Sequence, residues 1–252
     1  MTGDQHFTTR TAAVVGAGSG IGRAIALRLA SEGARVTAIG RTHARLVETA
    51  ALATTPMTPL VCDIADPEAI DRLGESLEQM HGGLDVLVCN SAIGVNAIMH
   101  ETPTEALDAI IATNIRGTYL CLQMGIRLML ASGGGAVVVV GSLGALRPAP
   151  RASAYGMSKA ATHAMARHAA LEYADRNIRV NVVAPGATDT ALLSAADDEV
   201  RAQVSGAIPD GRIATPDEVA DVAVFLASDK CAHVTGQVWS IDGGASIGSA
   251  GR

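Results

Sequence analysis

The sequence predicts an α/β fold in which a single doubly wound parallel sheet is covered by helices on both faces. Seven short apolar runs alternate with longer segments of helical periodicity along the 252-residue chain. Uninterrupted runs of valine, isoleucine and leucine are typical of strands buried on both faces, as in a parallel sheet. Repeated strand–helix units imply right-handed crossovers, so we expect a Rossmann-type sheet of about seven parallel strands.

The two patterns place the elements along the chain. We expect strands at residues 11–15, 35–39, 58–62, 86–89, 136–140, 179–183 and 237–241. Helical periodicity is found, for example, at residues 21–32, 67–80, 106–131, 153–175 and 216–228. A chain of this length is most simply one domain over residues 1–252, with a flexible segment at 1–9. The irregular segment at 187–214 follows a late strand, where such sheets bind ligands, and is the expected substrate lid.

Composition excludes several classes of function. The net charge is −6 and the basic residues form no cluster, which argues against nucleic acid or an anionic membrane surface as a partner. No apolar stretch reaches the roughly 18 residues of a membrane span, and the polar N-terminus does not resemble a signal peptide. We therefore expect a cytoplasmic protein. The four cysteines lack metal-binding spacing, so no metal site is predicted.

A glycine-rich loop follows the first predicted strand and opens a helix. It reads Gly16-Ala-Gly-Ser-Gly-Ile-Gly22. Glycines allow a sharp turn and a close approach of the backbone to a pyrophosphate, which binds at the helix N-terminus. Plain tight turns also use glycine, but the position at the start of a strand–helix unit favours a dinucleotide site. Ile21 stands where the third glycine of the usual dinucleotide motif would fall.

A second motif carries acid–base chemistry. Tyr155 and Lys159 are four residues apart and share one face of a predicted helix, and Ser142 ends an all-valine run thirteen residues before Tyr155. We expect the ammonium to stabilise the phenolate and to lower the tyrosine pKa from its free value of about 10. Such a phenol is a general acid and base, and the serine hydroxyl can polarise a carbonyl. Alone the pair is a weak signal, because a half-buried tyrosine beside a solvated lysine is common.

Taken together, the motifs resemble the short-chain dehydrogenase/reductase family over nearly the whole chain, and in particular its 3-oxoacyl-ACP-reductase-like members. Residues 15–22 match the family pattern T-G-x-x-x-G-I-G except for Val15. The family's N-N-A-G motif aligns with Cys89-Asn90-Ser91-Ala92, where only Asn90 is identical, and this is the largest departure. Further matches follow in order at residues 62–64, 114, 181–186, 190 and 241–244.

The resemblance implies a site and a mechanism. Tyr155 would exchange a proton with the substrate oxygen, Ser142 would hold that oxygen, and Lys159 would lower the tyrosine pKa and bind the nicotinamide ribose. Asn114 would hold a water that links Lys159 to solvent. The implied catalytic residues are Asn114, Ser142, Tyr155 and Lys159. The expected cofactor contacts are Gly16, Ser19, Gly20, Ile21, Gly22, Arg41, Asp63, Ile64, Asn90, Ala92, Tyr155, Lys159, Pro185, Gly186, Thr188 and Thr190.

The end of the second predicted strand bears on the choice of cofactor. An NAD site usually carries Asp or Glu there to accept from the ribose 2′-hydroxyl, but this chain has Gly40 followed by Arg41 and Thr42. Arg41 is placed to pair with a 2′-phosphate and to stack on adenine. We therefore favour NADP(H). NAD(H) is the alternative if Arg41 is only a solvated residue at the start of a helix, since the glycine loop has no basic residue.

The function expected from these residues is an NADP(H)-dependent oxidoreductase that interconverts a ketone and a secondary alcohol, such as a 3-oxoacyl thioester or a small cyclic compound. The alternatives are an NAD-dependent alcohol dehydrogenase of the same family and a non-catalytic nucleotide-binding sensor. Arg147 and Arg151 could bind an anionic group, although solvated loop positions are more common, and His100 and His163 are interpreted as structural or exposed. The candidate pocket residues are Ile93, Val95, Asn96, Leu143, Ala145, Met157, Leu192 and Leu193.

The predicted helix after residue 153 bears on assembly. It is rich in alanine, which is a strong helix former and also permits close approach between helices. The family often assembles through this helix, so the resemblance implies a homodimer or a homotetramer.

Overall fold

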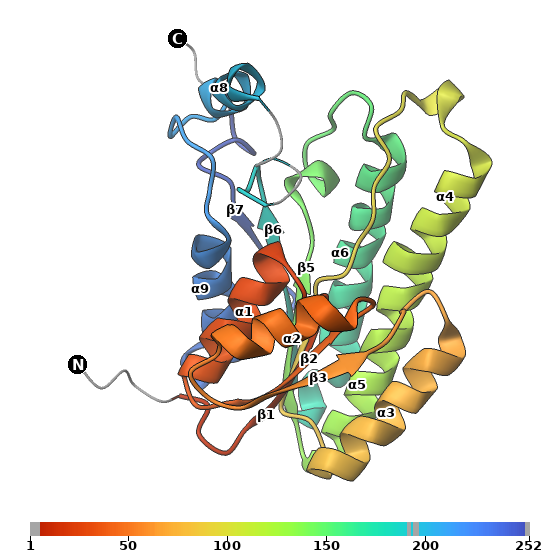
Figure 1. Cartoon of the computed structure of the whole chain (residues 1–252), viewed down its shortest axis with the longest axis vertical. Coiled ribbons are helices and arrows are strands. Elements are labelled where there is room, and N and C mark those ends of the chain that lie inside the picture. Colours follow the sequence, from red (N-terminus) through yellow and green to blue (C-terminus); the bar gives the residue numbers. More distant parts are fainter. Residues whose placement is uncertain (1–5, 191–192, 194–196, 250–252) are drawn as a thin grey trace.

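The computed structural model describes residues 6–190, 193 and 197–249 of the chain. Within these residues seven strands form one parallel sheet in the order β3-β2-β1-β4-β5-β6-β7 (Figure 1). The predicted seven-stranded parallel sheet is confirmed. The strands are β1 (Thr11–Val15), β2 (Arg35–Gly40), β3 (Met57–Val61), β4 (Val86–Cys89), β5 (Gly135–Val140), β6 (Ile178–Pro185) and β7 (Val238–Ile241).

Helices cover both faces of this sheet (Figure 1). One face carries α1 (Gly20–Ser31), α2 (His43–Leu52) and α9 (Pro216–Ala227). The other face carries α3 (Pro67–His81), α5 (Thr118–Ser132) and α6 (Ser153–Tyr173). Helix α2 has only ten residues, and it begins two residues after Arg41, where the sequence allowed for the start of a helix.

The two layers explain why the strands are apolar without interruption. Adjacent residues of β1 point to opposite faces, so Val14 packs with Leu29 of α1 and Val15 packs in the layer of Leu77 and Met129. Side chains of each strand alternate between the two cores, and both cores are closed to water. At the sheet edge, β3 tolerates Pro59 because an edge strand lacks a partner on one side.

The chain order reverses next to β1, which pairs with β2 on one side and β4 on the other. Strands β1 and β4 are neighbours in the sheet. The chain leaves β1 toward β2 on one side, and it leaves β4 toward β5 on the other side. In open α/β sheets a ligand crevice forms at this point, outside the carboxyl ends of the strands. The fold thus places the glycine-rich loop and the segment after β4 on the two sides of one crevice.

The helix predicted at residues 106–131 is divided in the structure. It consists of α4 (Thr104–Ile110), a π-helical turn (Ile111–Gly117) and α5. A Cβ on Gly117 would lie 2.5 Å from the carbonyl oxygen of Ile64, so the turn packs directly on the chain after β3. Periodicity of 3.6 residues cannot reveal a local change to five-residue hydrogen bonding. Such turns are found often at functional sites.

Two further expectations are corrected by the described residues. The segment predicted as an irregular lid contains α8 (Asp198–Gly206), whose N-cap Asp197 accepts a hydrogen bond from Val200 N at 2.9 Å. The flexible segment expected at residues 1–9 does not extend to Phe7, which is fully buried and whose amide donates to Glu32 O. Residues 1–5 lie outside the described part. None of the described helices is both long and apolar enough to span a bilayer.

Gly125 in α5 tests how tightly this helix packs on the sheet. A Cβ there would lie 2.5 Å from Leu87 Cδ2 of β4, and Leu87 is fully buried. We expect Gly125→Ala to lower the free energy of unfolding by about 1–3 kcal/mol, because overpacking outweighs the gain in helix propensity. The matched control is Gly206→Ala in α8, where a Cβ meets nothing within 4 Å. Chemical denaturation that shows both variants to be equally or more stable than the parent would contradict tight packing.

Candidate active site

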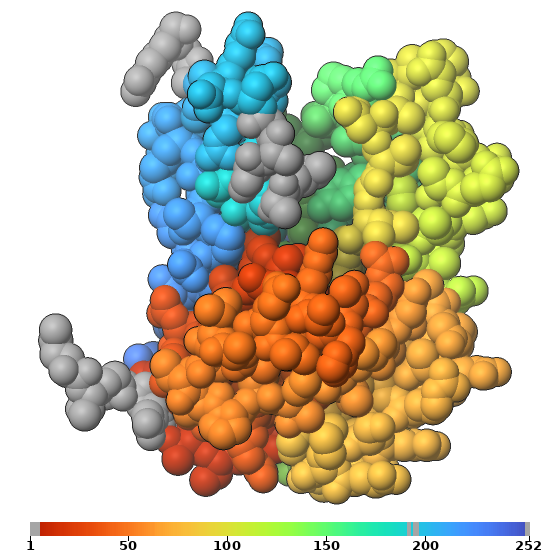
Figure 2. All heavy atoms as spheres, in the orientation of Figure 1, coloured from red at the N-terminus to blue at the C-terminus, as the bar shows by residue number. Residues whose placement is uncertain are grey.

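A cavity of about 1030 Å³ opens at the carboxyl ends of the strands and is lined by the segments that follow β1, β2, β3, β4, β5 and β6. Figure 2 shows the surface hollowed between the cyan segment around α8 and the yellow segment that leads to α4. Its volume is at the upper end for small-molecule sites and is sufficient for a dinucleotide together with a small substrate.

The glycine-rich loop has the geometry of a pyrophosphate cradle. Gly16 has φ +88°, and a Cβ there would lie 2.8 Å from Asn90 Nδ2 and from Ser91 N. A Cβ on Gly22 would lie 2.1 Å from Gly16 O, so only glycine allows the loop to sit on the start of α1. The Ser19 side chain does not cap α1, which leaves the first amides of the helix open to an anion. These residues therefore fit a dinucleotide.

Asn90 explains how the chain tolerates its departure from the family motif. Its Nδ2 donates to Gly16 O at 3.1 Å and ties the end of β4 to the glycine-rich loop. Cys89, which replaces the first asparagine of the motif, is the buried last residue of β4. The tie between the two sides of the crevice is therefore retained by the one identical residue.

The far end of the cavity is basic. Arg41, Thr42 and Arg45 line it together with Asp63. Thr42 is the N-cap of α2 but makes no side-chain cap hydrogen bond, so it leaves the first amides of α2 uncapped. Arg45 was missed by prediction from the sequence, although it lies in the first turn of the helix that was allowed for after Arg41.

Tyr155 and Ser142 meet at the inner part of the cavity. The Ser142 side chain hydrogen-bonds the Tyr155 phenol, and Ser142 Oγ also accepts from Gly144 N at 3.0 Å. Burial raises the pKa of Tyr155 above its ordinary value, and the hydrogen bond from Ser142 opposes this only in part. The lowered tyrosine pKa expected from the sequence is therefore wrong for the protein alone, because desolvation outweighs the hydrogen bond from Ser142.

Lys159 is buried beside the phenol. Its Nζ donates to Val140 O at 2.7 Å and lies 5.8 Å from the centroid of the Tyr155 ring. Burial lowers the pKa of Lys159 from 10.5 to about 8. The ammonium is thus costly to keep charged and is held in one position by a carbonyl at the end of β5. The predicted pairing of the tyrosine and lysine on one helical face is confirmed as geometry.

Asn114 lies in the π-helical turn, and its side-chain amide makes three hydrogen bonds to neighbouring groups. Its Oδ1 accepts from Ile93 N at 2.9 Å, and its Nδ2 donates to Ile93 O at 2.8 Å and to Ser158 Oγ at 2.9 Å. These contacts occupy three of the four hydrogen-bonding positions of the amide. The Asn114 side chain therefore joins Ile93, in the segment after β4, to Ser158 of α6. Ser158 is the residue before Lys159.

His163 is a residue whose place in the site the sequence did not reveal. It is buried one turn after Lys159, and its Nε2 accepts from Ser142 N at 3.4 Å. A Cβ on Gly141 would lie 2.1 Å from this Nε2, so the ring fills the space that glycine leaves. Burial, together with the nearby Lys159 charge, lowers the pKa of His163 to about 4. The ring is thus neutral near pH 7 and supports the backbone of Ser142.

Most residues predicted for the site lie on the cavity. Gly20, Gly22 and Asn114 are not among the residues that line it. Of the pocket candidates, Leu143, Ala145 and Met157 do not line it, and Leu192 lies outside the described residues. Arg147 turns away, since its guanidinium donates to Ala245 O and Gly248 O. The predicted residues on the cavity are Gly16, Ser19, Ile21, Arg41, Asp63, Ile64, Asn90, Ala92, Ile93, Val95, Asn96, Ser142, Arg151, Tyr155, Lys159, Pro185, Gly186, Thr188, Thr190 and Leu193.

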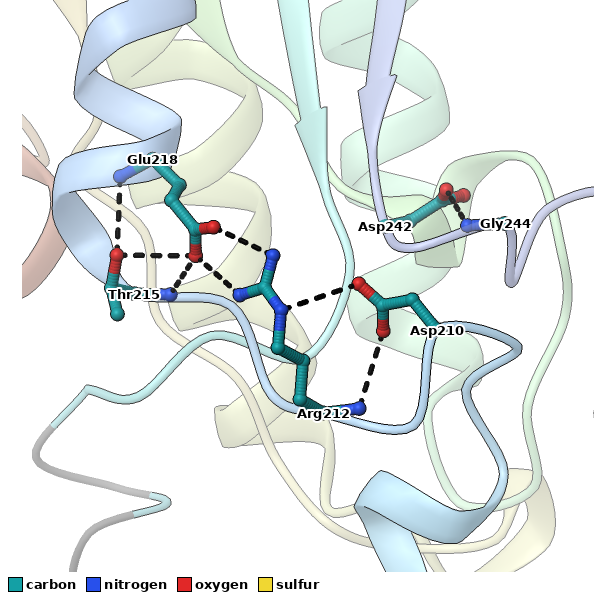
Figure 3. Close-up of polar contacts among 6 residues, drawn as sticks. All are labelled: Asp210, Arg212, Thr215, Glu218, Asp242 and Gly244. Carbon is teal, nitrogen blue, oxygen red and sulfur yellow. Dashed lines mark hydrogen bonds and ion pairs between the residues drawn. The ribbon is translucent and has the colours of Figure 1, made fainter.

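The segment after β6 reaches over the cavity and is fixed at its far end. Val200 and Val204 of α8 line the cavity with Leu193. Where this segment ends, Arg212 Nη2 pairs with Glu218 Oε1 at 2.7 Å and Arg212 Nε lies 3.6 Å from Asp210 Oδ2 (Figure 3). The Arg212 guanidinium lowers the pKa of Glu218 to about 2, so this attachment is charged at neutral pH.

The described residues include no group of three or more histidine, cysteine or acidic side chains that could hold a metal ion. All four cysteines are free and buried, as expected for small core residues. Burial raises the pKa of the Cys89 thiol to about 12, so this group beside Lys159 is a neutral thiol at neutral pH.

Comparison with known proteins agrees with this geometry. A family model described as enoyl-(acyl carrier protein) reductase matches residues 16–246. The 3-oxoacyl-[acyl-carrier-protein] reductase FabG of Thermotoga maritima is 38% identical, with 93% of this chain and 96% of that protein covered. The cis-4-hydroxycyclohexanecarboxylate dehydrogenase of Sinomonas cyclohexanicum is 40% identical, with 95% and 98% covered.

Solved structures give the same result. A short-chain type dehydrogenase/reductase from Mycobacterium marinum superposes with a TM-score of 0.90 at 30% identity, covering 97% of this chain and 98% of its own. Levodione reductase superposes with a TM-score of 0.88 at 30% identity, covering 95% and 98%. The chain belongs to the short-chain dehydrogenase/reductase family and is an NAD(P)-dependent oxidoreductase that acts on CH–OH or C=O groups.

The buried lysine gives the folded protein a measurable pH dependence. Because the pKa of Lys159 is about 8 in the folded state and 10.5 as its ordinary value, the unfolded chain binds more protons between these pH values. We expect the free energy of unfolding of the cofactor-free protein to rise between pH 8 and 10.5, relative to Lys159→Met, by roughly 3 kcal/mol. The matched control is Lys230→Met at an exposed position. Parallel pH profiles for the parent and Lys159→Met would contradict the burial of a charged amine.

Proposed function

We propose that this protein is an NADP(H)-dependent oxidoreductase that interconverts a ketone or 3-oxo compound and a secondary alcohol, with Tyr155 as general acid and base. The observation that carries the proposal is the meeting of Tyr155, Ser142 and Lys159 in the cavity that also contains the glycine-rich cradle. A nicotinamide bound there supplies or accepts the hydride, and the protein handles the proton.

The proton is transferred at the Tyr155 oxygen. In reduction this oxygen gives its proton to the substrate carbonyl, and in oxidation it takes the proton from the alcohol. Ser142 already hydrogen-bonds the phenol, so a substrate oxygen that enters between them receives two hydrogen bonds. That arrangement stabilises negative charge on the oxygen as it develops.

Lys159 and Asn114 support this transfer. The Lys159 ammonium, fixed on Val140 O, places positive charge beside the phenolate that remains after transfer. Asn114 has three of its four amide positions occupied, so its first role is to hold Ile93 and Ser158 in place. The predicted water that links Lys159 to solvent would use the remaining position of Oδ1 or the backbone of the π-helical turn.

The nature of the substrate is suggested by the cavity and the relatives. Apolar residues line the substrate end, among them Ile93, Val95, Leu193, Val200 and Val204. One relative is named for a 3-oxoacyl thioester and another for a hydroxylated cyclohexane ring. We therefore propose a 3-oxo or cyclic ketone and its alcohol. An NAD-dependent alcohol dehydrogenase remains the alternative, and a non-catalytic sensor is disfavoured by the complete catalytic set.

NADP(H) is the proposed cofactor because the ribose end of the cavity has two arginines. Arg41 and Arg45 line it, and no carboxylate stands at the end of β2, where Gly40 is buried against Leu46. Among the described residues neither arginine forms an ion pair with a protein carboxylate. A 2′-phosphate there would gain charge-assisted hydrogen bonds from both.

Assembly, the lid and location complete the proposal. Apolar side chains are exposed on α5 and α6, including Tyr119, Leu130, Met157 and Leu171. These exposed side chains support a homodimer or homotetramer. Sedimentation equilibrium tests this as a multiple of the 25.6 kDa chain, and a monomer at micromolar concentration would contradict it. Residues 187–214 are the proposed lid of a single domain, and the proposed location is cytoplasmic.

Tyr155→Phe tests the role of the phenol. Removing only the hydroxyl should lower kcat by at least about 100-fold, the lower range for general acid–base catalysis, while the dissociation constant for the nicotinamide cofactor changes little. Steady-state kinetics and fluorescence titration measure the two quantities. The control is Tyr173→Phe at the end of α6, which does not line the cavity. A Tyr155→Phe enzyme with more than a tenth of the parent kcat would refute the assigned role.

Arginine substitutions test the choice of cofactor. We expect the parent to bind NADPH more tightly than NADH, and the double variant Arg41→Ala/Arg45→Ala to lose about 10- to 100-fold of this preference, as charge-assisted hydrogen bonds predict. Fluorescence titration of both nucleotides gives the ratio. Arg176→Ala, which removes an exposed arginine elsewhere, should retain it. Tighter binding of NADH by the parent would establish the alternative cofactor.

A further inference from the structure

One arginine of the cavity is placed apart from the nucleotide site. Among the described lining residues, Arg41, Arg45 and Asp63 follow β2 and β3, and Lys159 is buried on α6. Arg151 instead comes from the loop between β5 and α6, and it lines the cavity next to Pro150 and Ala152. The substrate end therefore has one exposed cation in a lining that is otherwise apolar or neutral.

The guanidinium of Arg151 is oriented by Asn96. Arg151 Nε donates to Asn96 Oδ1 at 2.9 Å, and Nη2 donates to Asn96 O at 3.4 Å. The backbones are also joined, since Ala97 N donates to Arg151 O at 3.2 Å. These contacts connect the loop after β5 with the loop after β4 across the substrate end. A freely solvated arginine would have no such fixed orientation.

The backbone of Arg151 is in an unusual conformation for its residue type. Its φ is +62°, in the left-handed region that favours glycine. Strained residues of this kind are found where a side chain must be presented in a particular direction. Here the strained position presents a guanidinium to the cavity in which Tyr155 and Ser142 lie.

Most of the donors of this guanidinium are unused. Arginine has five N–H groups, and the contacts to Asn96 take two of them. Among the described residues no carboxylate forms an ion pair with Arg151. The acid on the lid next to Thr188, Asp189, already pairs with Arg201 Nη1 at 2.9 Å. A donor fork with no acidic partner suits a planar anion that comes from outside.

We infer that the substrate carries an anionic group at the end remote from the reacting carbonyl, and that Arg151 binds this group while Asn96 acts as a positioning residue. The inference rests on the proposed ketone and alcohol chemistry and adds the class of substrate. The body of the molecule lies against Ile93, Val95 and Leu193. The anion is either a carboxylate of the substrate itself or a phosphate of a thioester carrier, because both offer oxygens to the same fork.

Two matched pairs of compounds test the inference and separate the sources. The first pair is 4-oxocyclohexanecarboxylate and its neutral methyl ester. The second is acetoacetyl-coenzyme A and the neutral N-acetylcysteamine thioester of acetoacetate. For one of the two pairs, we expect the parent to have a higher kcat/KM with the charged compound than with the neutral one. Arg151→Gln should reduce this ratio of kcat/KM values by about 10-fold, as a charge-assisted hydrogen bond at an exposed site predicts.

The variants distinguish binding of the anion from general damage. In Arg151→Gln the loss should be in KM for the charged compound, and Arg151→Lys should recover part of it because the charge remains. Asn96→Ala should also raise this KM, since the guanidinium loses its orientation. Arg147→Gln is the matched control: that guanidinium binds Ala245 O and Gly248 O away from the cavity, so the ratio should be retained.

The outcomes also separate this inference from the proposed function. If Arg151→Gln lowers the charged-to-neutral ratio of kcat/KM for the first pair, the substrate is a carboxylate. If it lowers this ratio for the second pair, the anion is the phosphate of a carrier. Turnover with equal kcat/KM for charged and neutral members of both pairs, or ratios that Arg151→Gln leaves unchanged, would overturn the anionic substrate and leave the proposed function standing. No turnover of any of the four compounds with NADPH or NADH would contradict the proposed function itself.

Discussion

The site depends on a buried ammonium that is held by a backbone carbonyl. Lys159 donates to Val140 O at the end of β5, and the ring of Tyr155 lies beside it. Burial of this charge is unfavourable, as its pKa of about 8 indicates, so the surrounding fold must stabilise it in place. The parallel sheet provides that support, because it brings the end of β5 and the start of α6 together at the opening of the crevice.

The neighbouring groups avoid a second charge near this lysine. Burial keeps His163 neutral near pH 7 and Cys89 in its thiol form, although both lie close to the ammonium. His163 can therefore accept a hydrogen bond from the Ser142 amide, and Cys89 acts as a small apolar residue. Among the described residues the only hydrogen-bond partner of Lys159 Nζ is Val140 O, which leaves the charge available to the phenol.

The fold and much of the site could be predicted because they rest on local patterns. Unbroken apolar runs such as the one that ends at Val140 identify buried parallel strands, and the spacing of Tyr155 and Lys159 places both on one helical face. Other features depend on packing between distant segments. The π-helical turn that holds Asn114 and the contact between Asn96 and Arg151 follow from contacts between distant segments, and the raised tyrosine pKa follows from burial; no local pattern records either.

The pKa of Tyr155 depends on both burial and the charges around it. Its change on cofactor binding is therefore the most direct test of the proposed acid–base site. The phenolate absorbance of Tyr155 is obtained as the pH-dependent difference between the parent and Tyr155→Phe, with and without NADP⁺. In the cofactor-free protein the pKa should lie above its ordinary value of about 10, because burial dominates. With the cationic nicotinamide bound the pKa should fall, because a positive charge near the phenol favours the phenolate. A pKa below 10 without cofactor, or one that NADP⁺ leaves unchanged, would contradict the account.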